Sequence, residues 1–175
     1  MKKFFAYTIL GIFFSSSLLA QDTEFPKGFI MHLRLHNGMQ TQFNTTPDLY
    51  VVGAQLVPQV TVIPSRLRAG IAAGVFYAYK QVNALVGPTA SLKIKSFQAG
   101  PFGTAGNVQL NLEHLWGTDN QHLFGGGIYL DLLNKAMVGI TTHRDYELNN
   151  WWIQGVLAIR ISKTKKVDEP FNQKK

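Results

Sequence analysis

The chain has 175 residues and no cysteine. This absence excludes a disulfide framework and a lipid anchor on a cysteine thiol, so the fold must be stable without cross-links. After residue 20 the sequence also lacks any apolar run long enough for a transmembrane helix. No segment repeats its apolar residues with the period of a helix. If the protein lies in a membrane, it therefore crosses the membrane as strands.

The first 20 residues have the composition of a secretory signal peptide. Lys2 and Lys3 form a basic start, Phe4–Leu19 is an apolar run, and Ala20 is a small residue suited to cleavage. The alternative is an N-terminal membrane anchor, since the run is about as long as the shortest spanning helices. We expect a cleaved signal peptide over residues 1–20, one barrel domain over 21–162, and a disordered basic periplasmic tail over the lysine-rich residues 163–175.

Along the rest of the chain, apolar and polar residues alternate at nearly every step. Residues 31–36, 90–95 and 107–113 are clear examples. Successive side chains of a strand point to opposite faces, so such segments have one apolar and one polar face. Most are near the ten residues that a tilted membrane-spanning strand needs. The eight predicted strands are Gly28–Asn37, Leu49–Ile63, Leu67–Lys80, Ala84–Phe97, Asn107–Trp116, Leu123–Leu133, Ala136–Asp145 and Trp151–Ile161.

These segments predict an all-β fold, an eight-stranded antiparallel up-and-down transmembrane β-barrel. Consecutive hairpins form a meander, and closing the meander on itself removes its exposed edges. The interior of eight strands is just wide enough for side chains, so we expect a filled lumen and no pore. The polar connectors Gly38–Asp48 and Tyr146–Asn150 are expected to face the outside of the cell.

The position of the charges favours a polar interior. A charged group that faces lipid costs a few kcal/mol near the membrane midplane, so the aliphatic face is assigned to lipid. In the resulting lumen charge network, Arg34 and Arg68 are expected to pair with Glu113 and Asp131. The charged residues predicted to point inward are Arg34, Arg66, Arg68, Lys93, Lys95, Glu113, Asp131 and Arg160.

Aromatic residues gather at the end of the predicted barrel where the odd-numbered strands finish. Tryptophan and tyrosine prefer the boundary between hydrocarbon and water, so this arrangement predicts an aromatic girdle. The alternative is an ordinary aromatic core at one pole of a soluble barrel. The girdle residues are Tyr50, Tyr77, Tyr79, Trp116, Phe124, Tyr146, Trp151 and Trp152.

The signal peptide, the strand count, the alternation and the unequal loops together resemble the small eight-stranded outer-membrane barrels of the OmpA/OmpX type. The resemblance covers Gly28–Ile161 and rests on no sequence motif. It implies location in the outer membrane, contact with outer-membrane lipid and insertion by the barrel assembly machinery. The chain departs from the family's pattern at its last strand, which ends in Ala158-Ile159-Arg160-Ile161 and not on an aromatic residue.

The sequence indicates a structural, adhesive or protective surface role with an unidentified extracellular ligand, and we expect no catalytic residue, cofactor, metal or nucleic acid. His32 and His36 share a face but lack a third metal ligand. One alternative is a lipid-modifying enzyme that uses His143 and Asp145. Another is a soluble periplasmic barrel that binds a hydrophobic ligand. The basic residues near the periplasmic mouth admit two interpretations, a site for a phosphate-bearing ligand or a solvated charged rim.

Overall fold

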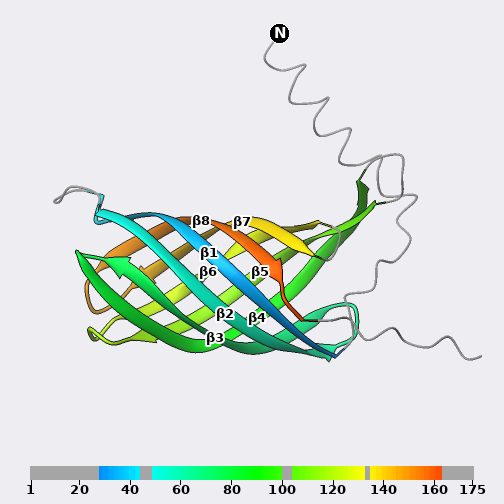
Figure 1. Cartoon of the computed structure of the whole chain (residues 1–175), viewed down its shortest axis with the longest axis horizontal. Coiled ribbons are helices and arrows are strands. Elements are labelled where there is room, and N and C mark those ends of the chain that lie inside the picture. Colours follow the sequence, from blue (N-terminus) through cyan, green and yellow to red (C-terminus); the bar gives the residue numbers. More distant parts are fainter. Residues whose placement is uncertain (1–27, 44–48, 100–103, 133–134, 163–175) are drawn as a thin grey trace, which may run out of the picture.

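A computed structural model describes residues 28–43, 49–99, 104–132 and 135–162, and all of its regular structure is β (Figure 1). The predicted signal peptide and basic tail lie outside these residues. The strands are β1 (Phe29–Thr41), β2 (Leu49–Ile63), β3 (Leu67–Ala78), β4 (Gln81–Ala99), β5 (Thr104–Gly117), β6 (His122–Leu132), β7 (Ala136–Asp145) and β8 (Asn150–Arg160).

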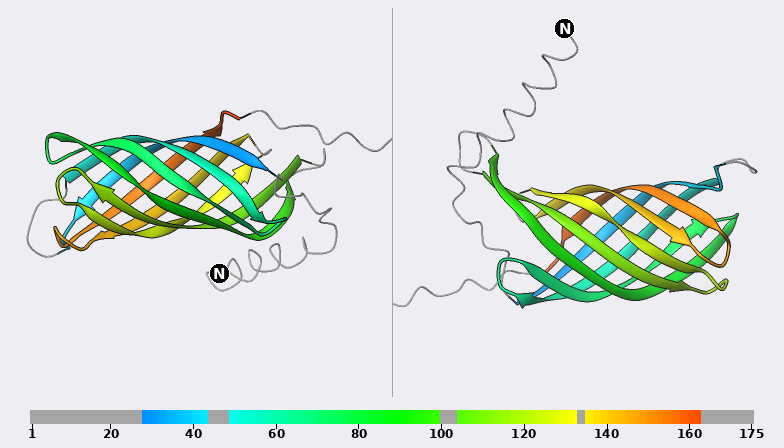
Figure 2. Two further views of the ribbon diagram at one scale, coloured as in Figure 1. Left: turned by 90° about the horizontal axis from the view of Figure 1, so that it is seen from below. Right: turned by 180° about the vertical axis from the view of Figure 1, so that it is seen from behind.

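Each strand pairs antiparallel with the next one, and β8 pairs with β1, so the sheet closes into a barrel. The prediction of an all-β, eight-stranded antiparallel barrel is confirmed. We call the end where β1 begins and β8 ends the terminal end, and the opposite one the distal end. β4 and β5 extend beyond the other strands at the terminal end (Figure 2).

Six of the eight strands begin or end one to four residues away from the predicted boundary, and two of these differences arise at residues whose turn-forming tendency the sequence does not reveal. The sequence predicts a loop that begins at Gly38, but Gly38 pairs with Val51 and Gln154 inside the sheet. A Cβ there would lie 2.0 Å from the carbonyl oxygen of Ile153, so only glycine permits this approach of β8. Tyr79 and Lys80 were assigned to the third strand, but φ angles of 54° and 62° make them a two-residue hairpin turn.

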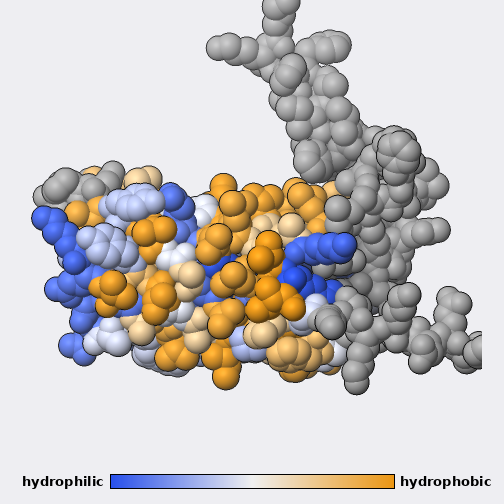
Figure 3. Space-filling model, viewed as in Figure 1, coloured by the Kyte–Doolittle hydropathy of each residue, from blue (hydrophilic) through white to orange (hydrophobic). Residues whose placement is uncertain are grey.

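Burial alternates along the strands, with polar side chains inside and apolar ones outside. In β1, His32, Arg34 and His36 are buried, whereas Leu35 is 52% exposed. On the face seen in Figure 3, hydrophobic side chains cover the middle of the wall and hydrophilic ones gather at the distal end, on the left. The barrel therefore has a polar interior and an exposed apolar surface, as the alternation predicts.

Two inward assignments were wrong. Lys95 is exposed, because the pairing of β4 with β5 shifts between Lys93 and Lys95 and sets Lys95 opposite the outward-facing Val108. Such a bulge adds one residue and reverses the parity beyond it. Arg66 is exposed in the β2–β3 turn, where strict alternation no longer applies.

Trp152 corrects the predicted girdle, because its side chain lies inside the barrel with 1% of its surface exposed. Its ring packs edge-on against Phe76, with the ring centroids 5.9 Å apart. Consecutive strand residues face opposite sides, so Trp151 and Trp152 cannot both point outward. Trp152 belongs instead to an internal apolar cluster with Val51, Val57, Ala72, Phe76, Ala78, Leu85, Leu115 and Leu123.

At Gly87, which faces the interior on β4, the neighbouring strand lies too close for a side chain. A Cβ on Gly87 would lie 1.8 Å from the carbonyl oxygen of His114, whereas one on the outward Gly155 would meet its nearest atom at 3.7 Å. We expect Gly87→Ala to lower the free energy of unfolding by about 1–3 kcal/mol, because the β5 backbone must move. Gly155→Ala should change it by less than about 0.5 kcal/mol. Urea titration of the folded barrel measures both, and equal effects would contradict this reading of the strand spacing.

Candidate functional site: the polar lumen

The centre of the lumen is an ion pair that crosses the barrel. Arg34 on β1 and Glu113 on β5 are both almost fully buried, and the Nη1 group of Arg34 contacts Oε1 of Glu113. The two strands are four apart in a closed ring of eight, so they form opposite walls. The guanidinium also lies 5.0 Å above the ring of Tyr129. The pair therefore joins two walls that share no backbone hydrogen bonds.

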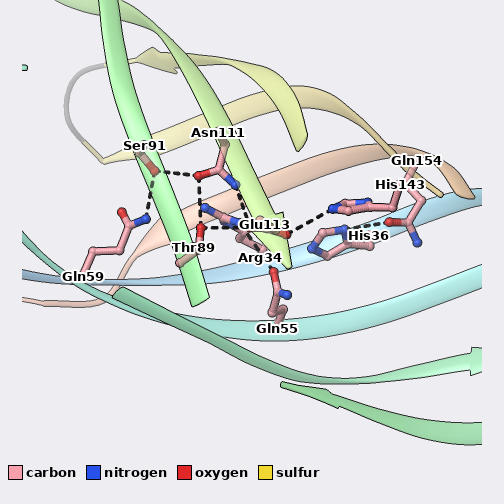
Figure 4. A network of polar contacts seen from close by, with 10 residues as sticks. All are labelled: Arg34, His36, Gln55, Gln59, Thr89, Ser91, Asn111, Glu113, His143 and Gln154. Atoms are coloured by element: carbon pink, nitrogen blue, oxygen red, sulfur yellow. Dashed lines mark hydrogen bonds and ion pairs between the residues drawn. The ribbon is translucent and has the colours of Figure 1, made fainter. Parts of the chain in front are cut away.

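Glu113 has further polar partners on its own strand and on β4 and β7. Its Oε1 accepts a hydrogen bond from Nδ2 of Asn111 at 2.6 Å and one from the hydroxyl of Thr89 at 3.3 Å. Its Oε2 lies 3.4 Å from Nε2 of His143 on β7. A buried carboxylate is tolerated when its oxygens are paired in this way. Groups from four strands, β1, β4, β5 and β7, thus meet at one acid (Figure 4).

Neutral polar side chains continue the network along the lumen. Nε2 of Gln59 donates to Oγ of Ser91 at 2.8 Å, and that hydroxyl donates to Oδ1 of Asn111 at 2.7 Å. Toward the distal end, Nδ1 of His36 lies 3.2 Å from Oε1 of Gln154 (Figure 4). The charged members are predicted from the sequence but these amides and hydroxyls are not, although Asn111 and Gln154 share the inward parity of their strands.

The second predicted acid lies nearer the terminal end. Oδ2 of Asp131 accepts hydrogen bonds from Nδ2 of Asn107 at 3.3 Å and from Nε2 of Gln109 at 3.1 Å. Arg68 is buried on β3, and the half-buried Arg160 lies opposite the buried His32. Lys93 is half-buried opposite Gln109. The inward charges therefore form two groups, one around Glu113 and one around Asp131.

The two residues considered for catalysis have different partners. His143 faces Glu113, whereas Oδ1 of Asp145 accepts hydrogen bonds from the backbone N–H groups of His122, Glu147 and Leu148 at 3.1–3.3 Å. Asp145 thereby holds the β7–β8 turn against β6. Among the described residues, no group of three histidine or acidic side chains is arranged to hold a metal ion.

Seven of the eight predicted girdle residues lie on the outer surface. Trp151 is half-buried there, and the phenol of Tyr79 accepts a hydrogen bond from Asn150. Burial, and then the charge of Asp145, raise the pKa of Tyr79. His114 and His122 stack beside Trp116 on the same outer surface, and sequence reasoning had not included either. The six predicted girdle residues with exposed side chains are Tyr50, Tyr77, Tyr79, Trp116, Phe124 and Tyr146.

The sequence matches no protein-family model, and no curated protein is detectably similar to it. Within the described residues, no helix is long and apolar enough to cross a bilayer.

The ion pair allows a direct test of coupling across the lumen. We expect Arg34→Met or Glu113→Gln alone to lower the free energy of unfolding by about 3–5 kcal/mol, because each leaves a buried charge without its partner. The double variant should lose clearly less than the sum of the two. Urea titration of the four proteins gives the coupling energy, and Lys135→Met, in an exposed turn, is the control. Strictly additive losses would mean that the two groups are energetically independent.

Proposed function

We propose that the chain is an integral outer-membrane β-barrel protein of the OmpA/OmpX type. The observation that carries this proposal is the inverted polarity of the barrel, with ionic and amide side chains enclosed and large aliphatic side chains exposed around the wall. Examples of the latter are Ile71, Ile128, Ile140 and Leu157, each more than half exposed. An apolar surface of this extent in water invites association, whereas hydrocarbon accommodates it.

Strand length supports the same placement. The ten residues of β7 extend for about 33 Å at the usual rise of a strand. A tilt of about 40° reduces this to about 25 Å along the barrel axis, which matches the height of the apolar band of outer-membrane barrels. The aromatic residues at the distal end would then lie at one boundary of the bilayer.

The polar lumen argues against a soluble carrier for a hydrophobic ligand. Such a carrier needs an apolar cavity, yet the positions that line the centre here are Arg34, Glu113, Gln55, Asn111 and Thr89. Moving an apolar ligand into that network would break hydrogen bonds without replacing them.

The filled lumen also favours a role other than transport. Cross-lumen contacts occupy the space that a channel would require. We therefore propose a non-enzymatic structural, adhesive or protective role, exerted by the wall and by the distal loops facing the outside of the cell. Insertion would depend on the barrel assembly machinery.

Gel mobility and fractionation test the membrane assignment. The protein in detergent should migrate differently on a denaturing gel before and after boiling, because a membrane barrel stays folded in detergent. In the producing cell it should remain with the outer membrane after osmotic shock. Release by osmotic shock without detergent would exclude an integral barrel.

A charge on the wall provides a sharper test. Leu157 is 62% exposed in the middle of the sheet, between Leu35 and Val138, whereas Ile63 lies at the β2–β3 turn and is 47% exposed. We expect Leu157→Arg to lower the stability in lipid vesicles by about 2–4 kcal/mol and Ile63→Arg by about 0–1 kcal/mol, because the cost depends on depth. A water-soluble barrel would tolerate both equally.

A further inference from the structure

The outer wall has a hollow that the lumen network does not explain. Two adjoining cavities of about 650 and 440 Å³ follow β5, β6 and β7 on the outside of the barrel. They share Gly126, Gly127 and Thr142, so they form one continuous groove. Its wall is apolar, with Val108, Leu130 and Val138 toward the terminal end.

The groove exists because one outward position has no side chain. Gly126 faces outward between Leu112 on β5 and Thr142 on β7, and its outward neighbours along β6 are the large residues Phe124 and Ile128. A Cβ on Gly126 would lie 2.0 Å from the carbonyl oxygen of Asn111, so close packing of β5 and β6 excludes any larger residue there. The hollow is therefore built into the strand packing.

A positively charged side chain, that of Arg144, lies at the distal end of the groove. Together with Tyr146 and Trp151, it lines the smaller of the two cavities, the one nearer the distal end. Its guanidinium carbon lies 5.3 Å from the centre of the Trp151 ring and 6.0 Å from that of Tyr146. Its Nη2 group donates a hydrogen bond to Oδ1 of Asn149 at 2.6 Å. Within the described ranges, this bond uses one of the five N–H groups that a guanidinium carries, which leaves four donors for other acceptors.

The dimensions of the groove match one leaflet of a bilayer. From Val138 to Arg144 the strand advances about 20 Å, which a barrel tilt of about 40° reduces to about 15 Å along the membrane normal. Half of an apolar band of about 25 Å is about 13 Å, so the groove extends through slightly more than one leaflet. The apolar part of the groove thus spans the depth of an acyl chain, and the arginine lies at the depth of the headgroup.

We propose that this groove binds a single phosphate-bearing lipid, with one acyl chain along Gly126 and the phosphate on Arg144. The inference rests on the membrane placement proposed above. It adds a defined lipid site to the wall, in which stacking on Trp151 and Tyr146 holds the guanidinium in place and charge-assisted hydrogen bonds hold the phosphate.

Native mass spectrometry of the detergent-folded full chain tests the site. The probes are dioleoylphosphatidylglycerol, the phosphate-free dioleoylglycerol of the same chains, and inorganic phosphate. We expect one phosphatidylglycerol to bind, and dioleoylglycerol to bind about tenfold more weakly. Inorganic phosphate should not displace the lipid. Displacement by inorganic phosphate, or a dimer that forms through the groove, would overturn the proposal.

Two variants, each with a control variant, distinguish the contacts of the acyl chain from those of the headgroup. Arg144→Gln should weaken the binding of phosphatidylglycerol about tenfold and leave the binding of dioleoylglycerol unchanged. Thr142→Phe, which fills the shared part of the groove, should weaken both lipids. The controls are Arg66→Gln, an exposed arginine at the terminal end, and Val75→Phe, an outward position on β3. Lipid binding that Arg144→Gln leaves unchanged, or that the controls reduce as strongly, would refute the site.

Gel mobility before and after boiling distinguishes a failure of the lipid site from a failure of the membrane placement. A folded, heat-modifiable barrel whose variants bind lipid like the parent refutes the groove alone. A protein that does not fold in detergent refutes the membrane placement and the groove together.

Discussion

Every strand residue of this closed barrel has only two environments, the lumen and the outer surface. The period of a strand is two, so the side of one residue determines the side of all others until a bulge or a turn intervenes. In β1, this constraint encloses His32, Arg34 and His36 together and leaves Leu35 outside. The polar lumen and the apolar wall are therefore two results of one pattern. Exchanging the two faces would require a change of parity in every strand.

Enclosing charge has an energetic cost that determines how the lumen must be built. A buried ion is stabilised only when its charge is paired and hydrogen-bonded, and Oε1 of Glu113 has donors from Arg34, Asn111 and Thr89, while Oε2 faces His143. Arg34 lies on β1 and Thr89 on β4, so the full arrangement around Glu113 on β5 forms only when the barrel has closed. The network therefore favours the correct strand order and register over alternatives in which Glu113 would be buried alone.

The sequence alone was sufficient for the strand count, the barrel and the polarity of its two faces, because alternation is a strong local signal. It also placed Arg34 and Glu113 on the same side, although contact across the lumen depends on which walls face each other. The errors have specific causes. Lys95 was misplaced because a bulge leaves no mark in the residue pattern. Tyr79 and Lys80 form a turn without glycine or proline, so they carried no turn signal. The girdle prediction is wrong for Trp152 because it rested on the aromatic side chain and not on strand parity, which places Trp152 inside.

The inside and the outside of this barrel are specialised in different ways. Inside, ionic side chains from opposite and neighbouring walls contact one another across the lumen. Outside, Gly126 opens a hollow in the largely aliphatic wall, and Arg144 supplies a positive charge at its mouth. A glycine that only close strand packing requires would not by itself indicate a ligand. A cation held between two aromatic rings at the end of the same hollow provides a second, independent feature, and together they match an amphipathic molecule with one anionic end. Recognition by this protein is therefore better sought on its wall than within its lumen.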